Sequence, residues 1–250
     1  MRFNDFNIQW GEKIFRKTKR ITLELSNLCN YSLIHHDCPI NSQKTQQILP
    51  ESIFNSVLNT CNAYDFQGVI SFHMYNEPLI DPRLFRFMER VKKTIPKARL
   101  FLLTNGWYLD QNLCRDLELC GLDFLEISAY SESEYLRFKK LKSKINIRIE
   151  KRKLDNRLNW YNEIPKDNLP KPCYCPLYEI CITCIGKVIL CPYDWQREHV
   201  FGDLNKESLE QILQKTKIWN IYESLSTGHR SLKLCKNCIS SRGEPFINEK

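Results

Sequence analysis

The cysteine content limits what this chain can fold into more than any other feature of its sequence. Seven of its twelve cysteines lie after residue 172. The first twenty residues lack the apolar run of a secretory signal, and no stretch is long and apolar enough to span a bilayer. We therefore expect a cytoplasmic protein, in which thiols stay reduced. In such a protein, cysteines bind metal or take part in chemistry more often than they form disulfides.

The spacing of the C-terminal cysteines is typical of a metal site. Cys235 and Cys238 are separated by two residues, which presents two thiolates to one centre. Twelve residues separate Cys173 from Gly186 and four separate Gly186 from Cys191. The glycine predicts a hairpin turn that returns Cys191 toward Cys173. Four thiolates suit tetrahedral zinc or a cubane iron–sulfur cluster, and the spacing leaves both open.

The first 150 residues alternate between short β-branched or apolar runs and longer amphipathic ones. Strands are predicted over residues 21–26, 69–75, 99–103, 124–129 and 145–149, and helices over residues 51–63, 81–94, 109–120 and 131–141. This alternation predicts an α/β fold with a parallel sheet, whose binding residues gather at the carboxyl ends of the strands. Five or six such units would form a partial (β/α)6 barrel rather than a closed eightfold one.

A change of composition divides the chain. The alternation stops near Asn156, and residues 161–172 hold three prolines. We predict a barrel core over residues 1–155, a linker over 156–172 and a small cysteine-rich domain over 173–250. Apolar residues make up 42% of the chain and charged residues 26%, so a packed core is expected.

The cysteine-rich segment resembles a known domain. The resemblance lies in Cys173, the run Gly186-Lys-Val-x-x-Cys191, the run Phe201-Gly-Asp-Leu204, a helix around 209–213, and Cys235-x-x-Cys238. These features resemble the twitch form of the SPASM domain, which extends the barrel of radical S-adenosylmethionine (SAM) enzymes. The resemblance implies one auxiliary 4Fe–4S cluster bound by Cys173, Cys191, Cys235 and Cys238.

A second resemblance to the radical SAM family follows the first strand. Cys29 stands where the family begins a three-cysteine loop, but only Cys38 follows within reach. Keeping the family's final two-residue gap puts His35 in the middle position, so the resemblance implies a first cluster bound by Cys29, His35 and Cys38. His36 and Cys61 are alternative third ligands, and both histidines could instead only form hydrogen bonds. Imidazole ligation raises the potential of an iron–sulfur cluster.

Polar residues after later strands fit the same family. The run Tyr75-Asn-Glu-Pro78 resembles the Gly-Glu-Pro motif, and Thr104-Asn105-Gly106 ends the third predicted strand. In the family these positions contact the amino group, the carboxylate and the ribose of SAM. The SAM-binding residues implied are Asn76, Glu77, Pro78, Thr104, Asn105 and Ser128.

The resemblance implies an enzyme with two 4Fe–4S clusters and SAM, reduced by a donor such as flavodoxin or ferredoxin. The loop from Cys29 to Pro39 resembles that of splicease-type peptide maturases, which excise tyramine from a ribosomal precursor peptide and leave an α-keto-β-amino acid. Such maturases use a small accessory leader-binding protein. The net charge of +8 would suit an acidic leader peptide, and neither nucleic acid nor membrane is expected as a partner.

Two alternatives remain. The chain's length and residues 75–125 also resemble 2-deoxy-scyllo-inosamine dehydrogenases, which oxidise an aminocyclitol. Those enzymes have the regular three-cysteine loop and an Arg-Gly-Gly turn, whereas this chain has Arg148-Ile-Glu-Lys-Arg152 in that neighbourhood. The other alternative is a zinc-bearing binding protein without catalytic activity. We favour peptide maturation.

Overall fold

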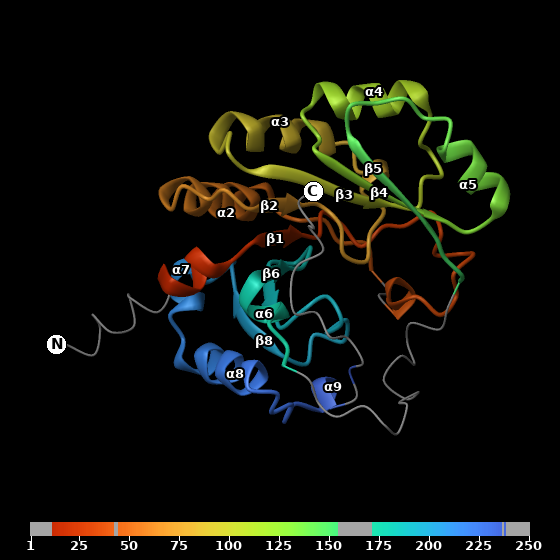
Figure 1. Ribbon diagram of the computed structural model, residues 1–250. Coiled ribbons are helices and arrows are strands. Elements are labelled where there is room, and N and C mark those ends of the chain that lie inside the picture. The colour runs from red at the N-terminus through yellow and green to blue at the C-terminus, as the bar shows by residue number, and fades with distance from the viewer. Residues whose placement is uncertain (1–11, 43–44, 155–171, 237, 239–250) are drawn as a thin grey trace.

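The computed structural model describes residues 12–42, 45–154, 172–236 and 238 (Figure 1). The predicted linker over 156–172 therefore lies outside the described residues, apart from its last residue. None of the helices in the described ranges is long and apolar enough to cross a membrane.

One eight-stranded sheet runs through the molecule in the order β5-β4-β3-β2-β1-β6-β7-β8. Its members are β1 (Arg20–Leu23), β2 (Val69–Ser71), β3 (Arg99–Thr104), β4 (Phe124–Ala129), β5 (Asn146–Lys151), β6 (Glu179–Ile182), β7 (Lys187–Ile189) and β8 (Val200–Asp203). The first five strands are parallel, and β6 is parallel to β1. The pairs β6–β7 and β7–β8 are antiparallel. The predicted parallel α/β fold is confirmed.

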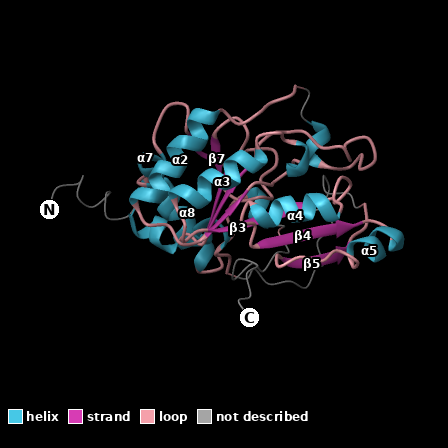
Figure 2. Cartoon of the chain, turned by 90° about the horizontal axis from the view of Figure 1, so that it is seen from above, coloured by secondary structure: helices cyan, strands magenta, loops and turns pink. Residues whose placement is uncertain are grey.

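Helices cover one side of the parallel strands. They are α2 (Glu51–Ala63), α3 (Leu84–Thr94), α4 (Gln111–Leu119) and α5 (Glu132–Phe138), and Figure 2 shows α4 lying over β4. Local signals set their starts: Asp110 accepts a hydrogen bond from Leu113 N at 2.8 Å, and Ser131 forms a capping box with Glu134. The remaining helical elements are η1 (Pro39–Ser42), η2 (Pro78–Ile80), α6 (Cys175–Tyr178), α7 (Leu209–Leu213), α8 (Thr216–Ser226) and α9 (Lys233–Lys236).

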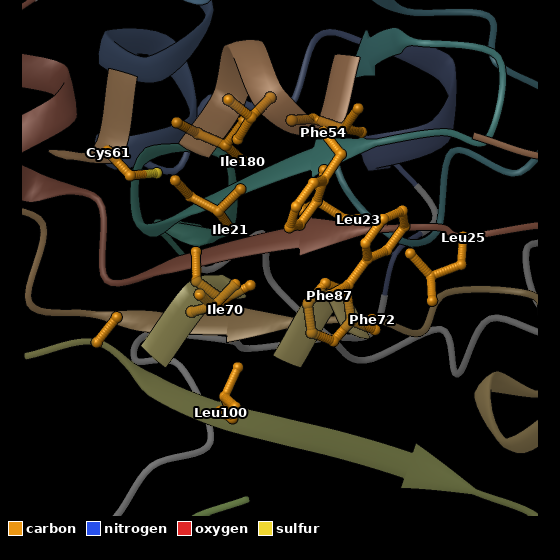
Figure 3. Close-up of a cluster of buried hydrophobic side chains, with 14 of the residues drawn as sticks. Ile21, Leu23, Leu25, Phe54, Cys61, Ile70, Phe72, Phe87, Leu100 and Ile180 are labelled. Atoms are coloured by element: carbon orange, nitrogen blue, oxygen red, sulfur yellow. The ribbon is translucent and has the colours of Figure 1, made fainter. Parts of the chain in front are cut away.

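The apolar core lies between these helices and the sheet. Figure 3 shows Ile21, Ile70 and Leu100 from three neighbouring strands in one buried cluster with Phe54 and Phe87 from the helices. The rings of Phe54 and Phe87 stack with centroids 4.1 Å apart. Because side chains alternate along a strand, the other side of the sheet is left for polar residues.

The strand β6 joins the predicted C-terminal domain to the barrel core. All four of its residues are buried, and Ile180 pairs in register with Ile21 of β1. Ile180 enters the same core as Ile21 and Ile70 (Figure 3). The parallel part of the sheet therefore has six strands, the sixth of which comes from the cysteine-rich segment.

Candidate functional site

A cavity of about 490 Å³ lies on the polar side of the sheet. The loops after β1, β2 and β3 enclose it, together with inward-facing residues of β1 and β3–β6 and the loop after β7. Seven residues predicted from the sequence line it: Cys29, His35, Cys38, Asn76, Glu77, Asn105 and Ser128. Pro78 and Thr104 are buried behind the wall, where Pro78 begins η2 and the Thr104 hydroxyl donates to Glu77.

The loop after β1 brings three of the predicted ligands to this cavity. His35 N donates to the Tyr31 carbonyl at 2.7 Å, and Cys38 N donates to the His35 carbonyl at 3.2 Å. These turns bury His35 and Cys38, which are 5% and 8% exposed. His36 is exposed and lies outside the cavity wall. Of the two histidines, His35 is therefore the one placed with the cysteines.

Cys61 does not belong to this group. It lies on α2, is fully buried, and packs in the apolar core beside Ile21 and Ile70 (Figure 3). Burial raises the pKa of its thiol to about 12. A thiol held neutral in an apolar core behaves as a small hydrophobic side chain.

Cys29 is held close to two other ionisable groups. Burial raises the pKa of its thiol to about 11, and the charges of Glu77 and Cys38 add to the rise. Asn105 Nδ2 lies 3.9 Å from Cys29 Sγ and donates to Asn30 Oδ1 at 2.8 Å. A bound cation would stabilise the thiolate that this crowding disfavours, so these donors fit an iron centre.

Glu77 is a buried carboxylate with three protein donors. Thr104 Oγ1 and Leu79 N donate to Oε1 at 2.7 Å and 3.0 Å, and Asn105 N donates to Oε2 at 2.8 Å. Burial raises its pKa, and these hydrogen bonds oppose the rise. A carboxylate has about four lone-pair sites. One acceptor position is thus left for a ligand group in the cavity.

The Asn76 side chain forms hydrogen bonds within its own loop. Its Oδ1 accepts from Met74 N at 2.9 Å, and its Nδ2 donates to the Phe72 carbonyl at 3.1 Å. Both ends of the amide therefore fix the loop that carries Glu77. This explains how asparagine can stand where the family's motif has glycine.

A second, smaller pocket gathers the C-terminal cysteines. It is lined by Cys173, Cys175, Cys191, Cys235 and Cys238. The predicted hairpin turn is present: Gly186 has φ +79° and lies between β6 and β7, where Thr183 N donates to the Lys187 carbonyl. Burial raises the pKa of Cys235 to about 12, with the charges of Cys173 and Cys238 as further causes. Five cysteines around one pocket are a donor set whose chemistry suits an iron–sulfur cluster.

Sequence reasoning missed one member of this pocket. Cys175 is not among the four ligands that the resemblance implied, yet it lines the pocket. After burial, the charge of Cys175 is the next cause that raises the pKa of Cys191 well above its ordinary value. The Cys173-Tyr-Cys175 spacing was the available signal.

As the side chains stand, no three His, Cys, Asp or Glu groups among the described residues have the geometry of a metal-ion site.

Glu179 connects the two pockets. Its Oε1 accepts from Thr22 Oγ1 at 2.7 Å, and its Oε2 lies 3.9 Å from Cys175 Sγ. Glu179 and Thr22 line the cavity, whereas Cys175 lines the cysteine pocket. One carboxylate thus stands between the two sites. The sequence did not point to Glu179, because an acidic residue before an apolar run usually faces solvent.

Residues 173–239 match the SPASM family, an iron–sulfur cluster-binding domain. The chain is 24% identical over 230 residues to the S-adenosyl-L-methionine-dependent 2-deoxy-scyllo-inosamine dehydrogenase of Niallia circulans, covering 87% of this chain and 91% of that protein. The predicted resemblance of the C-terminal segment is confirmed.

Solved structures share the fold. The crystal structure of BtrN in complex with AdoMet and 2-DOIA has a TM-score of 0.76 at 23% identity, covering 90% of this chain and 94% of that one. The structure of anSMEcpe with bound AdoMet has a TM-score of 0.57 at 12% identity, covering 88% and 86%. The predicted barrel with a C-terminal extension is therefore a fold found in proteins whose structures contain AdoMet.

Proposed function

We propose that this chain, a relative of the radical SAM enzymes that carries a SPASM domain, catalyses a two-electron oxidation of a substrate held in the cavity. The observation that carries the proposal is that two thiol sites lie next to one cavity. Cys29, His35 and Cys38 lie on one side, and the five-cysteine pocket lies behind Glu179 on the other.

The residues present fit the groups that this chemistry requires. Cys29, His35 and Cys38 would hold the first 4Fe–4S cluster, and Cys173, Cys191, Cys235 and Cys238 the second. Glu77 and Asn105 would orient SAM, with Ser128 facing it from β4. When bound, SAM and the first cluster supply the radical that removes a hydrogen atom from the substrate.

The protein's own groups complete the oxidation. After loss of a hydrogen atom from carbon, the substrate must lose one proton and one electron to form a carbonyl group. Glu179 would accept the proton, and the cysteine pocket next to it would hold the group that takes the electron. Pro192, Tyr193 and Trp195 close the cavity on the SPASM side, where the Tyr75 hydroxyl donates to the Pro192 carbonyl. This wall would keep water from the radical.

A second candidate is maturation of a ribosomal precursor peptide, including tyramine excision of the splicease type. The departure of the Cys29–Cys38 loop from three cysteines supports it, as do the basic residues Arg148, Lys151 and Arg152 in the cavity wall. In that case the substrate would be a peptide delivered by an accessory leader-binding protein. In either case the electron donor would be a flavodoxin or ferredoxin.

The test is reductive cleavage of SAM by the anaerobically reconstituted protein. We expect 5′-deoxyadenosine to form under dithionite with the wild type and with Cys120→Ser, whose thiol lies outside both pockets, but not with Cys29→Ser. Adding 2-deoxy-scyllo-inosamine or a tyrosine-containing peptide separates the candidates, since one would yield a ketone and the other a peptide lighter by tyramine. Absence of 5′-deoxyadenosine from wild type with both clusters assembled would refute the proposal.

A further inference from the structure

Three residues that line the cavity each have a buried side-chain N–H donor without a hydrogen-bond partner among the described residues. The three donors are Arg20 Nε, Arg152 Nε and Trp195 Nε1, and each is buried and unpaired in the described part of the chain. Buried polar atoms are nearly always paired, because an unmet donor costs about 1–3 kcal/mol. All three groups are donors. A ligand that supplies oxygen acceptors would therefore satisfy them.

The cost of a buried donor without a partner is greatest for Arg20. It opens β1, is only 5% exposed, and stacks its guanidinium over the Phe101 ring at 4.8 Å from the centroid. Across the described ranges, no carboxylate forms an ion pair with it, although arginine keeps its charge in any protein environment. A buried charge without a counter-ion is unfavourable.

The carboxylates of the cavity have other partners. Glu126 Oε1 accepts from Arg152 Nη2 at 2.6 Å, and Glu150 pairs with Arg148. Glu179 pairs with Arg20 in the strand register, but its carboxylate accepts from the Thr22 hydroxyl instead. Among the described residues, no carboxylate is thus ion-paired with Arg20, which leaves its guanidinium open to an acidic ligand.

We propose that Arg20 binds a carboxylate of the substrate, with the free N–H groups of Arg152 and Trp195 serving further substrate oxygens. The guanidinium fork matches a carboxylate with two parallel hydrogen bonds. Arg20 opens β1, whereas Cys29 follows the carboxyl end of that strand. The carboxylate is thus held away from the Cys29 site, and its binding energy positions the rest of the substrate in the cavity. This inference rests on the proposed function, and it selects an acidic substrate such as a peptide over a cationic aminocyclitol.

Isothermal titration calorimetry on the reconstituted protein with SAM tests this carboxylate anchor at Arg20. The probes are succinate and N-acetylglutamate, each with its amide counterpart, together with 2-deoxy-scyllo-inosamine. Arg20→Met is compared with Arg20→Lys and with the control Arg90→Met, whose arginine pairs with Glu51 on the helical side. Lysine keeps the positive charge but lacks the forked N–H groups of the guanidinium. Arg20→Lys should therefore bind the carboxylates with an affinity between those of the wild type and Arg20→Met.

We expect the carboxylates to bind the wild type and Arg90→Met at least about tenfold more tightly than their amides, and Arg20→Met to lose that preference. Without ligand, the thermal midpoint of Arg20→Met should equal or exceed that of the wild type, since a buried unpaired charge is removed. Equal binding of carboxylate and amide, no saturable carboxylate binding, or unchanged affinity in Arg20→Met would each overturn the proposal.

The two proposals fail differently. If SAM is not cleaved but carboxylates still bind through Arg20, the proposed function is wrong and the anchor stands. If SAM is cleaved and 2-deoxy-scyllo-inosamine binds equally to the wild type and Arg20→Met, with no carboxylate binding, the anchor is wrong and the radical chemistry stands.

Discussion

Glu77 accepts hydrogen bonds from two backbone N–H groups and from the Thr104 hydroxyl, which makes it sensitive to a small change. In Glu77→Gln, the side-chain NH2 group would replace one carboxylate oxygen and would face at least one of these hydrogen-bond donors. We expect the free energy of unfolding to fall by about 1–3 kcal/mol, because a buried donor loses its acceptor. Affinity for SAM should fall at least about tenfold. Urea unfolding and calorimetry measure the two effects.

Glu150→Gln is the matched control for this substitution. Glu150 also lines the cavity, but its partner is Arg148 on the partly exposed strand β5. Its unfolding free energy and SAM affinity should change little. Equal effects in the two variants would contradict the role assigned to Glu77.

Sequence reasoning located residues that carry a motif and missed those that do not. Cys29, His35 and Glu77 follow strand ends in a recognisable order, so their meeting at one cavity could be anticipated. Arg20 and Glu179 begin their strands and line the same cavity only because β6 pairs with β1. That pairing joins residues far apart in the chain, and no local pattern encodes it.

The β6–β7 hairpin depends on Gly186. A Cβ there would lie 2.3 Å from Ile53 Cδ1, whereas at Gly121, which has the same φ of +79°, it would meet only the flexible Lys92 side chain at 3.1 Å. Both alanine variants bear the left-handed backbone penalty of about 1–2 kcal/mol. Gly186→Ala should lose about 1–3 kcal/mol more through overpacking. Equal unfolding free energies for the two would show that packing at the hairpin is unimportant.

The pair of β7 and β8 includes an ion pair whose effect depends on pH. A hydrogen bond from Lys187 holds the pKa of Asp203 at about 2, below its ordinary value. Because the folded pKa is the lower one, the stabilisation is complete above about pH 4 and is lost as the pH falls toward 2. Asp203→Asn should cost about 1 kcal/mol at pH 7, since water screens part of the interaction.

Urea unfolding between pH 7 and pH 3 checks this expectation. The cost of Asp203→Asn should be constant from pH 7 to 5 and should shrink below pH 4. Asp65→Asn, whose Lys97 pair is exposed on both sides, should show a smaller effect. A cost of Asp203→Asn that grows as the pH falls would contradict the predicted direction of the pH dependence.

Most elements could be predicted from local signals, and the exceptions have physical causes. Helix α2 and strand β4 have the predicted bounds, because Pro50 precedes the helix and a mostly apolar run forms the strand. The helix expected from residue 81 begins at Leu84, since Asp81 accepts hydrogen bonds from the Arg83 backbone and side chain and holds a turn there. The predicted domain bounds remain predictions, since most of residues 156–172 are not described.

At the scale of the molecule, the continuous sheet predicts that both halves unfold together. Ile180 is 3% exposed and lies in the core with Ile21 and Ile70. Ile180→Ala should cost about 2–5 kcal/mol. Hydrogen–deuterium exchange should show protection falling in peptides of β3 as well as β7, whereas Leu119→Ala, at a 79% exposed position, should change neither. Loss of protection confined to β6–β8 would mean that the halves are independent.

The central claim is that two iron–sulfur sites flank one substrate cavity, and counting irons in matched variants tests it most directly. The anaerobically reconstituted wild type, His35→Ala and His36→Ala would each be assayed for iron and sulfide, with electron paramagnetic resonance spectra before and after SAM. We predict about eight irons in the wild type and in His36→Ala, about four in His35→Ala, and a spectrum that SAM shifts only where the first cluster is present. Four irons or zinc in the wild type, with no response to SAM, would contradict the account.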